Sequence, residues 1–289
     1  MSGIFWNFLV LLALGASAEG TSNLTHLGCS KDAVSGKGIL YIIRTLADPN
    51  QSGDQLNNSR ESRNLQVLLD TLGADIQDSP ADAMLIVGDY TLPPSSTARV
   101  TYAPCESAVM HGGKNGCLTA HALQLAYKMK DHFYWFFIVD DDTYVSHRNA
   151  VMALIKRVPK KELLALGYIG CGGQHCPDRR LGGGGFCGGA YALSVSTLEK
   201  IFNQSNGSSR HKVFLANLTL GKSGVSTDIF FGCLLREEGI LVAQLPSAFG
   251  MERTGDALAI DPDLEASEVD PLSVVLFHVN YSLMPGIYT

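Results

Sequence analysis

Three consecutive carboxylates are the residues of this sequence best placed to do chemistry. Asp140, Asp141 and Asp142 follow directly on the apolar run 133–139, whose aromatic and β-branched residues are typical of a strand buried on both faces. Ligands bind at the carboxyl ends of strands in an open α/β sheet, so we expect these acids to face a crevice. Three adjacent carboxylates repel one another, and a divalent cation would relieve that repulsion. The pattern therefore predicts a metal or catalytic site.

An acidic segment after a strand also occurs in two other settings. Asp is common in turns, so a strand followed by acids can mark only a solvated loop. A haloacid-type phosphatase also carries acids after a hydrophobic strand, in the order Asp-x-Asp-x-Thr or Val. The fifth position here is Tyr144, which counts against a metal-dependent phosphohydrolase of that kind.

Three more polar residues stand at the ends of expected elements. Asp89 follows the expected strand 84–87, where it could contact a nucleotide base or ribose or simply form a turn. Asp228 opens an apolar helix, where a carboxylate could also serve only the helix terminus. His278 ends the apolar strand 274–278, and a lone histidine in such a setting is usually a satisfied core residue.

A glycine-rich segment spans 182–194. No Lys-Ser or Lys-Thr follows it, so it is not a phosphate-binding P-loop. Glycines permit close backbone approach, which suits a wall against which a sugar could lie. A flexible surface loop is the alternative, but the run continues into the apolar residues 191–193, which favours a site.

The elements that must position these residues alternate along the chain. Expected strands lie at 38–45, 84–87 and 99–102, and expected helices at 60–73, 117–130, 146–157 and from 198 to 202. Leu65, Leu68, Leu69 and Leu72 share one face of the first helix, and Gly73 is expected to end it. This alternation predicts an α/β fold with one doubly wound, mostly parallel sheet flanked by helices.

Composition and the N-terminal segment limit the class of protein. The chain has 289 residues and a net charge of -6, without a Lys/Arg run that would follow a nucleic-acid backbone. Residues 4–16 are apolar and precede Ala16-Ser17-Ala18, the pattern of a signal-peptide cleavage site. We therefore expect a signal peptide at 1–18, a loosely ordered leader at 19–37, one domain at 38–289 and no membrane anchor.

Glycosylation sequons and cysteines also indicate the secretory route. Asn-x-Ser/Thr sequons are frequent in the chain, and among them are those that begin at Asn23, Asn57, Asn203, Asn206, Asn217 and Asn280. All seven cysteines follow the expected cleavage site, as suits disulfides formed in the Golgi or ER lumen or in a secreted protein. Cys105 with Cys117 is the favoured pair. Two further pairs are possible, Cys171 with Cys176 and Cys187 with Cys233, and they would leave Cys29 unpaired. The connectivity stays open.

Taken together, these pieces resemble the Fringe-like and core 1 type β-1,3-glycosyltransferases over residues 38–278. Asp-Asp-Asp-Thr-Tyr-Val at 140–145 looks like the aspartate motif of that family. The resemblance implies that Asp142 holds manganese while Asp140 and Asp141 reach the sugar and the ribose. Thr-Asp-Ile-Phe-Phe-Gly at 227–232 is similar to a Glu-Asp-Val-Phe-Val-Gly motif and implies that Asp228 is the catalytic base. Phe-His at 277–278 implies that His278 is the second metal ligand.

The same resemblance extends to the donor site and to one disulfide. The glycine-rich segment looks like the donor wall, in either of two registers, with Gly188 and Gly189 as expected contacts. Thr45 and Asp89 are the other expected donor-binding residues. A disulfide between the cysteines at 105 and 117 also resembles one in the family.

The resemblance implies a GT-A type fold and an inverting, Mn²⁺-dependent hexosyltransferase. Such an enzyme moves a hexose or N-acetylhexosamine from a UDP-sugar to a hydroxyl of a glycan or glycoprotein acceptor. The alternative is a non-catalytic relative that acts as a chaperone or carbohydrate-binding partner. Because Asp142, Asp228 and His278 are all present, the sequence favours the enzyme.

Overall fold

The computed structural model describes most of the expected domain. It covers residues 38–45, 64–65, 67–88, 101–105, 113–154, 157, 159–172, 184–202, 210–222 and 225–245, and the backbone of 248–249, 252–254, 257–259 and 276–278. The expected signal peptide, the leader and Asp89 lie outside these residues, as do the side chains of 189 and 210. No helix in the described ranges is long and apolar enough to cross a membrane.

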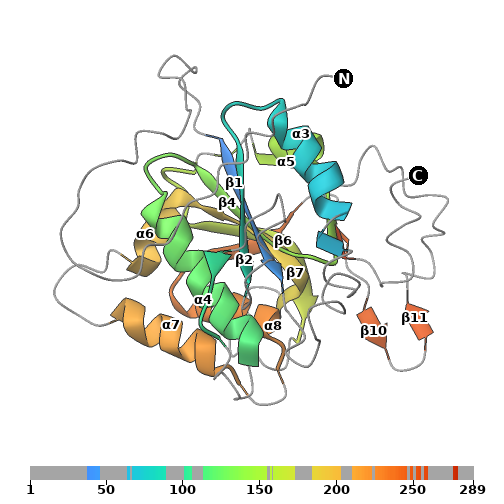
Figure 1. The fold of residues 1–289 in the computed structure, drawn as a ribbon. Coiled ribbons are helices and arrows are strands. Elements are labelled where there is room, and N and C mark those ends of the chain that lie inside the picture. The colour runs from blue at the N-terminus through green and yellow to red at the C-terminus, as the bar shows by residue number, and fades with distance from the viewer. Residues whose placement is uncertain are drawn as a thin grey trace, which may run out of the picture.

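A seven-stranded sheet forms the centre of the domain, in the order β3-β2-β1-β4-β7-β6-β8 (Figure 1). Its strands are β1 (Ile39–Thr45), β2 (Ala83–Gly88), β3 (Thr101–Tyr102), β4 (Trp135–Asp140), β6 (Leu164–Cys171), β7 (Gly185–Ser194) and β8 (Leu241–Gln244). Strand β7 is antiparallel to its neighbours β4 and β6, and the other four neighbouring pairs are parallel. The predicted fold class, a mostly parallel sheet flanked by helices, is confirmed.

Helices cover both faces of this sheet because the central strands are apolar on both sides. In β1, Leu40 and Ile42 join one buried cluster while Ile39, Tyr41 and Ile43 join the other. The first cluster packs against α4 (Gly113–Lys128), α6 (Val195–Phe202), α7 (Arg210–Leu220) and α8 (Thr227–Glu237). The second packs against η2 (Leu69–Gly73), α3 (Ala74–Gln77) and α5 (His147–Leu154), on the other side of the sheet in Figure 1.

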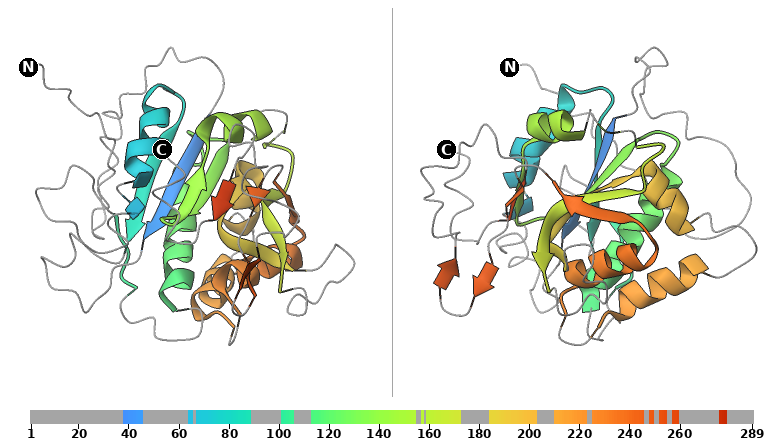
Figure 2. Two further views of the ribbon diagram at one scale, coloured as in Figure 1. Left: turned by 90° about the vertical axis from the view of Figure 1, so that its right-hand side faces the viewer. Right: turned by 180° about the vertical axis from the view of Figure 1, so that it is seen from behind.

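Two small sheets complete the described backbone. Strand β12 (Leu276–His278) lies between β5 (Thr143–Val145) and β9 (Ala248–Phe249), and is antiparallel to β5. In the left view of Figure 2, β12 is the red strand beside the central sheet. Strands β10 (Glu252–Thr254) and β11 (Ala257–Ala259) form a separate antiparallel pair. The expected strand at 274–278 is therefore confirmed over its last three residues.

The prediction that Gly73 ends its helix is wrong. Leu65, Leu68, Leu69 and Leu72 are buried as predicted. The chain then passes through the π-helical turn η2 and continues as α3 to Gln77. Gly73 is itself buried and has right-handed helical angles, φ −62° and ψ −41°, so it does not supply the left-handed residue that commonly ends a helix.

Over 185–194 the glycine-rich segment is a strand and not a flexible loop. One of its glycines, Gly185, is in close contact with α8. A Cβ at Gly185 would lie 2.5 Å from the Ile229 Cα on α8, and a Cβ at Gly232 on that helix would lie 2.7 Å from the Gly185 Cα. Both distances are too short for any real side chain. The two glycines therefore let α8 pack backbone to backbone on β7.

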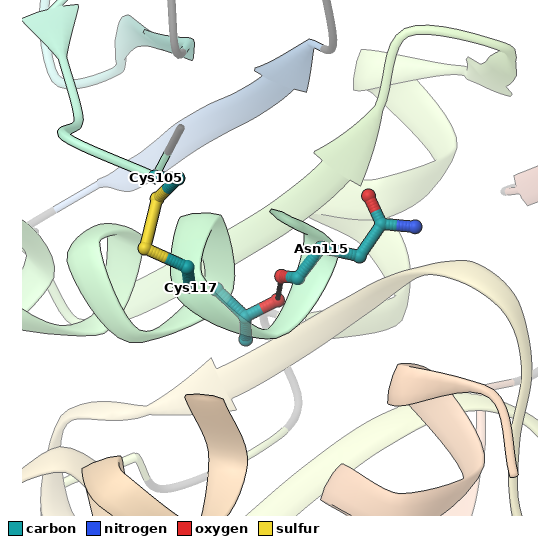
Figure 3. The surroundings of a disulfide bond; sticks show 4 residues. Cys105, Asn115 and Cys117 are labelled. Atoms are coloured by element: carbon teal, nitrogen blue, oxygen red, sulfur yellow. Dashed lines mark hydrogen bonds between the residues drawn. A yellow bond between two sulfur atoms is a disulfide. The ribbon is translucent and has the colours of Figure 1, made fainter. Parts of the chain in front are cut away.

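The disulfides agree with one predicted pair and correct the others. Cys105, just after β3, is bonded to Cys117 on α4 (Figure 3). Cys171 is bonded to Cys187, so the pairs of Cys171 with Cys176 and of Cys187 with Cys233 are wrong. Adjacent antiparallel strands β6 and β7 bring the Cys171 and Cys187 Cα atoms to 5.1 Å, a normal disulfide separation. Cys233 is also disulfide-bonded.

We predict that Asn217 carries an N-linked glycan in a cell that secretes this protein. This sequon lies wholly in the described part of the chain, and its asparagine is exposed on α7. Mass spectrometry of peptides from full-length protein, before and after removal of N-glycans, should show Asn217 occupied. The Thr219→Ala variant should abolish this modification alone. An unmodified Asn217 peptide from secreted wild-type protein would contradict the prediction.

We also predict that Gly185→Ala destabilises the fold by about 1–3 kcal/mol, because the new methyl group would overlap the backbone of α8. Urea unfolding of the two proteins measures this difference. Leu220→Ala, at a side chain that is 56% exposed, is the control and should change the free energy of unfolding by less than about 0.5 kcal/mol. Equal stability of Gly185→Ala and wild type would mean that β7 and α8 are not in close contact.

Candidate active site

A buried arginine joins the end of β4 to the start of α8. Arg44 and Asp140 are paired positions on the parallel strands β1 and β4. The Arg44 Nη2 lies 2.7 Å from the Asp140 Oδ1 and 3.1 Å from the Asp228 Oδ1. The arginine side chain is 3% exposed, against 24% for Asp140 and 16% for Asp228. We call Arg44, Asp140, Asp141, Asp142 and Asp228 the aspartate site.

Contacts from two further elements hold the Arg44 guanidinium in place. Its Nη1 donates to the Thr119 hydroxyl of α4 and, at 3.4 Å, to the Tyr191 hydroxyl of β7. The guanidinium carbon lies 5.6 Å from the centre of the Tyr191 ring, within the range of a cation–π contact. Burial acts to lower the pKa of Arg44, but Asp140, Tyr191 and Asp228 raise it more, so the side chain stays charged.

The carboxylates of the aspartate site repel one another. Burial raises the pKa of Asp140 well above its usual value, and Asp228, Asp142 and Asp141 add to this rise while Arg44 opposes it. Burial also raises the pKa of Tyr191, which is therefore a neutral phenol. Arg44 pairs with two of the four carboxylates, Asp140 and Asp228, and repulsion among the four acids is of the kind that a bound cation relieves.

Asp141 is held by the residue that ends β1. The Thr45 hydroxyl, which is 1% exposed, donates to the Asp141 Oδ2 at 2.7 Å. The Asp141 backbone N–H donates to the Arg44 carbonyl at 3.1 Å. Thr45 therefore lies in the candidate site, and its described contact is with a carboxylate of the aspartate motif.

The strand register brings His278 next to the aspartate motif. Asp142 is 8% exposed and immediately precedes β5. In the antiparallel pair of β5 and β12, His278 stands opposite Thr143. Two residues far apart in the sequence, Asp142 and His278, thus occupy neighbouring backbone positions at the edge of the candidate site.

Asp228 does more than serve the terminus of α8. It lies in the first turn of the helix, where a negative charge is favourable. The N-cap residue is Ser226, whose side chain makes no capping hydrogen bond. The described hydrogen bond of the Asp228 carboxylate comes from Arg44 on β1. The helix terminus therefore directs Asp228 towards the carboxyl end of the central sheet.

Gly188 and Gly189 lie beside the end of β4. Val139 pairs with Ala190 in the antiparallel pair of β4 and β7. The residues just before Ala190, which are the two glycines, therefore come beside Asp140, the residue just after Val139. Gly188 has φ +88°, a conformation that strongly favours glycine. The structure therefore brings these two glycines to the aspartate site, whereas Asp89 is outside the described residues.

One cluster of metal-ligand spacing in the described residues is not a metal site. The sulfurs of Cys105 and Cys117 and a ring nitrogen of His121 lie within 4.8 Å of one another. Both sulfurs belong to a disulfide and cannot bind a metal as thiolates.

The sequence interpretation missed Arg44, Thr119 and Tyr191. The signal for Arg44 was present, because it is the one charged residue in the apolar strand 39–45. A charge in a strand buried on both faces requires a charged partner, and the acids at the ends of neighbouring elements are such partners. Thr119 and Tyr191 gave no comparable signal, since both residue types are common in ordinary helices and strands.

Comparison with known proteins finds only distant structural similarities. No protein-family model and no curated protein matches this sequence. Similar solved structures include a glycosyltransferase involved in glycosylation of the major capsid of PBCV-1, with 9% identity, 87% of this chain and 100% of that chain covered, and a TM-score of 0.46. The galactosyltransferase LgtC has 12% identity, 86% and 94% coverage and a TM-score of 0.44. Mouse xyloside xylosyltransferase 1 has 11% identity, 84% and 98% coverage and a TM-score of 0.42. Because these TM-scores are below 0.5, we take no function from the likeness.

We predict that Arg44→Met lowers the free energy of unfolding by about 2–4 kcal/mol, somewhat less than for a fully buried ion pair, because it leaves two partly buried carboxylates without their arginine partner. Denaturant unfolding at neutral pH measures the loss. Arg148→Met, at an exposed position of α5, is the control and should have little effect. Adding Asp140→Asn and Asp228→Asn to Arg44→Met should recover part of the stability. A single Arg44→Met variant as stable as wild type would contradict the buried ion pairs.

Proposed function

We propose that this protein is a metal-dependent, inverting glycosyltransferase. It would move a hexose or N-acetylhexosamine from a UDP-sugar to a hydroxyl of a glycan or glycoprotein, forming a β-1,3 linkage. The observation that carries the proposal is the convergence of three separated segments: Asp140–Asp142 after β4, Asp228 in α8 and His278 in β12. These segments meet at the carboxyl end of β1 and β4, where ligands of α/β sheets bind.

The side chains that could act as metal ligands suit a divalent cation such as Mn²⁺. Asp142 and His278 would hold it, since they offer a carboxylate oxygen and an imidazole nitrogen from neighbouring backbone positions. Repulsion among the carboxylates, which contributes to the raised pKa of Asp140, also favours a cation here. When bound, the ion would neutralise charge that builds on the leaving diphosphate.

Asp228 is the proposed general base. Arg44 holds the Asp228 Oδ1 at 3.1 Å and thereby fixes the direction of the carboxylate. The other oxygen, Oδ2, would accept the proton of the acceptor hydroxyl. The acceptor oxygen then bonds to the anomeric carbon, the bond from that carbon to the diphosphate oxygen breaks, and UDP leaves. A single displacement of this kind inverts the anomeric configuration and needs no covalent intermediate.

The remaining residues of the site would bind and orient the donor. Asp140 and Asp141 would accept hydrogen bonds from sugar and ribose hydroxyls, with Arg44 and Thr45 fixing their positions. Next to Asp140, the glycine backbone at 188–189 would permit close approach of the sugar.

The secretory lumen is the proposed place of action. Disulfides at Cys105–Cys117 and Cys171–Cys187 suit an oxidising compartment. UDP-sugar donors and glycan acceptors would then be its partners in the Golgi or the ER, or the enzyme would be secreted.

We predict that the wild-type protein releases UDP from one UDP-sugar in the presence of Mn²⁺ and an acceptor. Asp228→Asn should lower the rate about 10²- to 10⁴-fold and still bind UDP, because it removes only the base. Asp142→Ala should lose Mn²⁺-dependent UDP binding. Asp131→Asn makes the same chemical change as Asp228→Asn at a side chain that is 77% exposed, and it should leave the rate unchanged.

Two results would count against this proposal. If wild type binds no UDP-sugar in Mn²⁺, the transferase proposal falls and a chaperone or carbohydrate-binding role takes its place. If Asp228→Asn keeps the wild-type rate, the protein is still a transferase but Asp228 is not its base.

A further inference from the structure

A second buried polar cluster lies on the other face of the sheet, outside the aspartate site. The Tyr41 hydroxyl of β1 is 2.9 Å from the His147 Nδ1 of α5, and the His147 Nε2 is 3.3 Å from the Asp82 Oδ2 just before β2. Tyr41 is fully buried, and the side chains of Asp82 and His147 are 6% and 12% exposed. We call these three residues the histidine clamp.

Two of the three clamp residues, Asp82 and Tyr41, make further contacts within or beside the sheet. Asp82 accepts hydrogen bonds from the Ile39 backbone N–H and the Ser79 hydroxyl, each at 2.5 Å. The Tyr41 ring is stacked on Phe137 of β4, with ring centres 5.6 Å apart. Asp82 and Tyr41 are therefore fixed by contacts that do not involve α5.

The protonation state of Tyr41 determines which group donates the hydrogen bond between Tyr41 and His147. Burial raises the pKa of Tyr41 well above its usual value, and the nearby Asp82 and Asp75 raise it further, so the phenol keeps its proton. The Tyr41 O–H can then donate to the His147 Nδ1, while the opposite ring nitrogen, Nε2, lies 3.3 Å from the Asp82 Oδ2. Both ring nitrogens of His147 therefore face a fixed polar partner, and the two contacts together orient the imidazole.

We infer that His147 is a positioning residue for the aspartate site, an inference that rests on the function proposed above. His147 is the first residue of α5, and the short strand β5 separates it from Asp142. The segment 141–146 is thus held at one end by β4 and at the other by the clamp. Because β5 pairs with the strand that carries His278, fixing this segment fixes the backbone of both proposed metal ligands.

Apolar packing alone would hold α5 less firmly at this end. The helix has eight residues, and its buried residues are Ala150 and Leu154, away from its start. An apolar side chain at position 147 could fill the space but could not fix the position of the first turn of α5 relative to β1. The hydrogen bond of His147 with Tyr41 and its close contact with Asp82 therefore locate the N-terminus of α5, and with it the end of the aspartate segment.

Two variants and a matched control test this role. Tyr41→Phe removes one hydroxyl from the clamp and keeps the ring, and His147→Gln removes the imidazole. Tyr127→Phe makes the same change as Tyr41→Phe on α4, at a ring stacked on Phe202. The first measurement is amide hydrogen exchange of the metal-free, full-length protein. The second is Mn²⁺ binding in the presence of UDP, followed by electron paramagnetic resonance.

We expect both clamp variants to speed exchange in 141–150 well beyond any change in β6, and to weaken Mn²⁺ binding about tenfold. The double variant should be no worse than His147→Gln alone, because the residues act as one unit. Tyr127→Phe should change neither quantity. If His147→Gln does not fold, Tyr41→Phe decides the test by itself.

The inference is overturned if exchange in 141–150 is unchanged, or if it rises only in step with exchange in β6, since that would be general destabilisation. Unchanged Mn²⁺ affinity in the clamp variants, with a wild type that binds the ion, would also overturn it. If wild type binds no Mn²⁺ with UDP, the proposed function fails and the positioning role fails with it, while the exchange data show separately whether the clamp holds the segment.

Discussion

The buried charge of Arg44 is the constraint on which the arrangement of this molecule depends. A guanidinium that is 3% exposed cannot be tolerated in an apolar sheet without charged partners. Its partners come from the end of β4 and the first turn of α8, and its remaining contacts come from α4 and β7. Four elements that approach the end of β1 from different directions are thus tied to one side chain, and the carboxylates they carry are gathered at one place.

The packing of α8 follows from small residues rather than from charge. Gly185 and Gly232 allow the helix to lie directly on β7, close enough for Asp228 to reach Arg44. The β6–β7 disulfide joins the same strand to its neighbour. Glycines in this region therefore have two different uses: some permit helix–strand contact, and Gly188 allows the backbone to turn beside Asp140.

Much of the fold could be predicted from local patterns in the sequence. Continuous apolar runs identified β1 and β4, and the leucine spacing identified the buried face of the helix before β2. The same reasoning failed where tertiary contacts decide. Gly73 stays helical because it is buried within a continuing helix, and the pairing of Cys171 with Cys187 depends on a strand pair that no local signal specifies.

The sequence singled out several residues of the candidate site but not the contacts between them. Asp140, Asp141 and Asp228 were singled out by their positions at the ends of elements. The structure pairs Asp140 and Asp228 with Arg44, and Asp141 with the adjacent Thr45. The partners of an acid cannot be deduced from its place at the end of a strand. The histidine clamp was even harder to predict from the sequence. Tyr41 and His147 stand in ordinary positions of a strand and a helix, and only the contact between them suggests a role.

The measurement that tests the central claim most directly is a crystal structure of the full-length protein with Mn²⁺ and UDP, with the ion located by its anomalous scattering. Our account predicts one manganese peak bound by Asp142 and His278, with the diphosphate against it and Asp228 still paired with Arg44. A peak at other residues, or UDP bound away from the carboxyl end of β1 and β4, would contradict it.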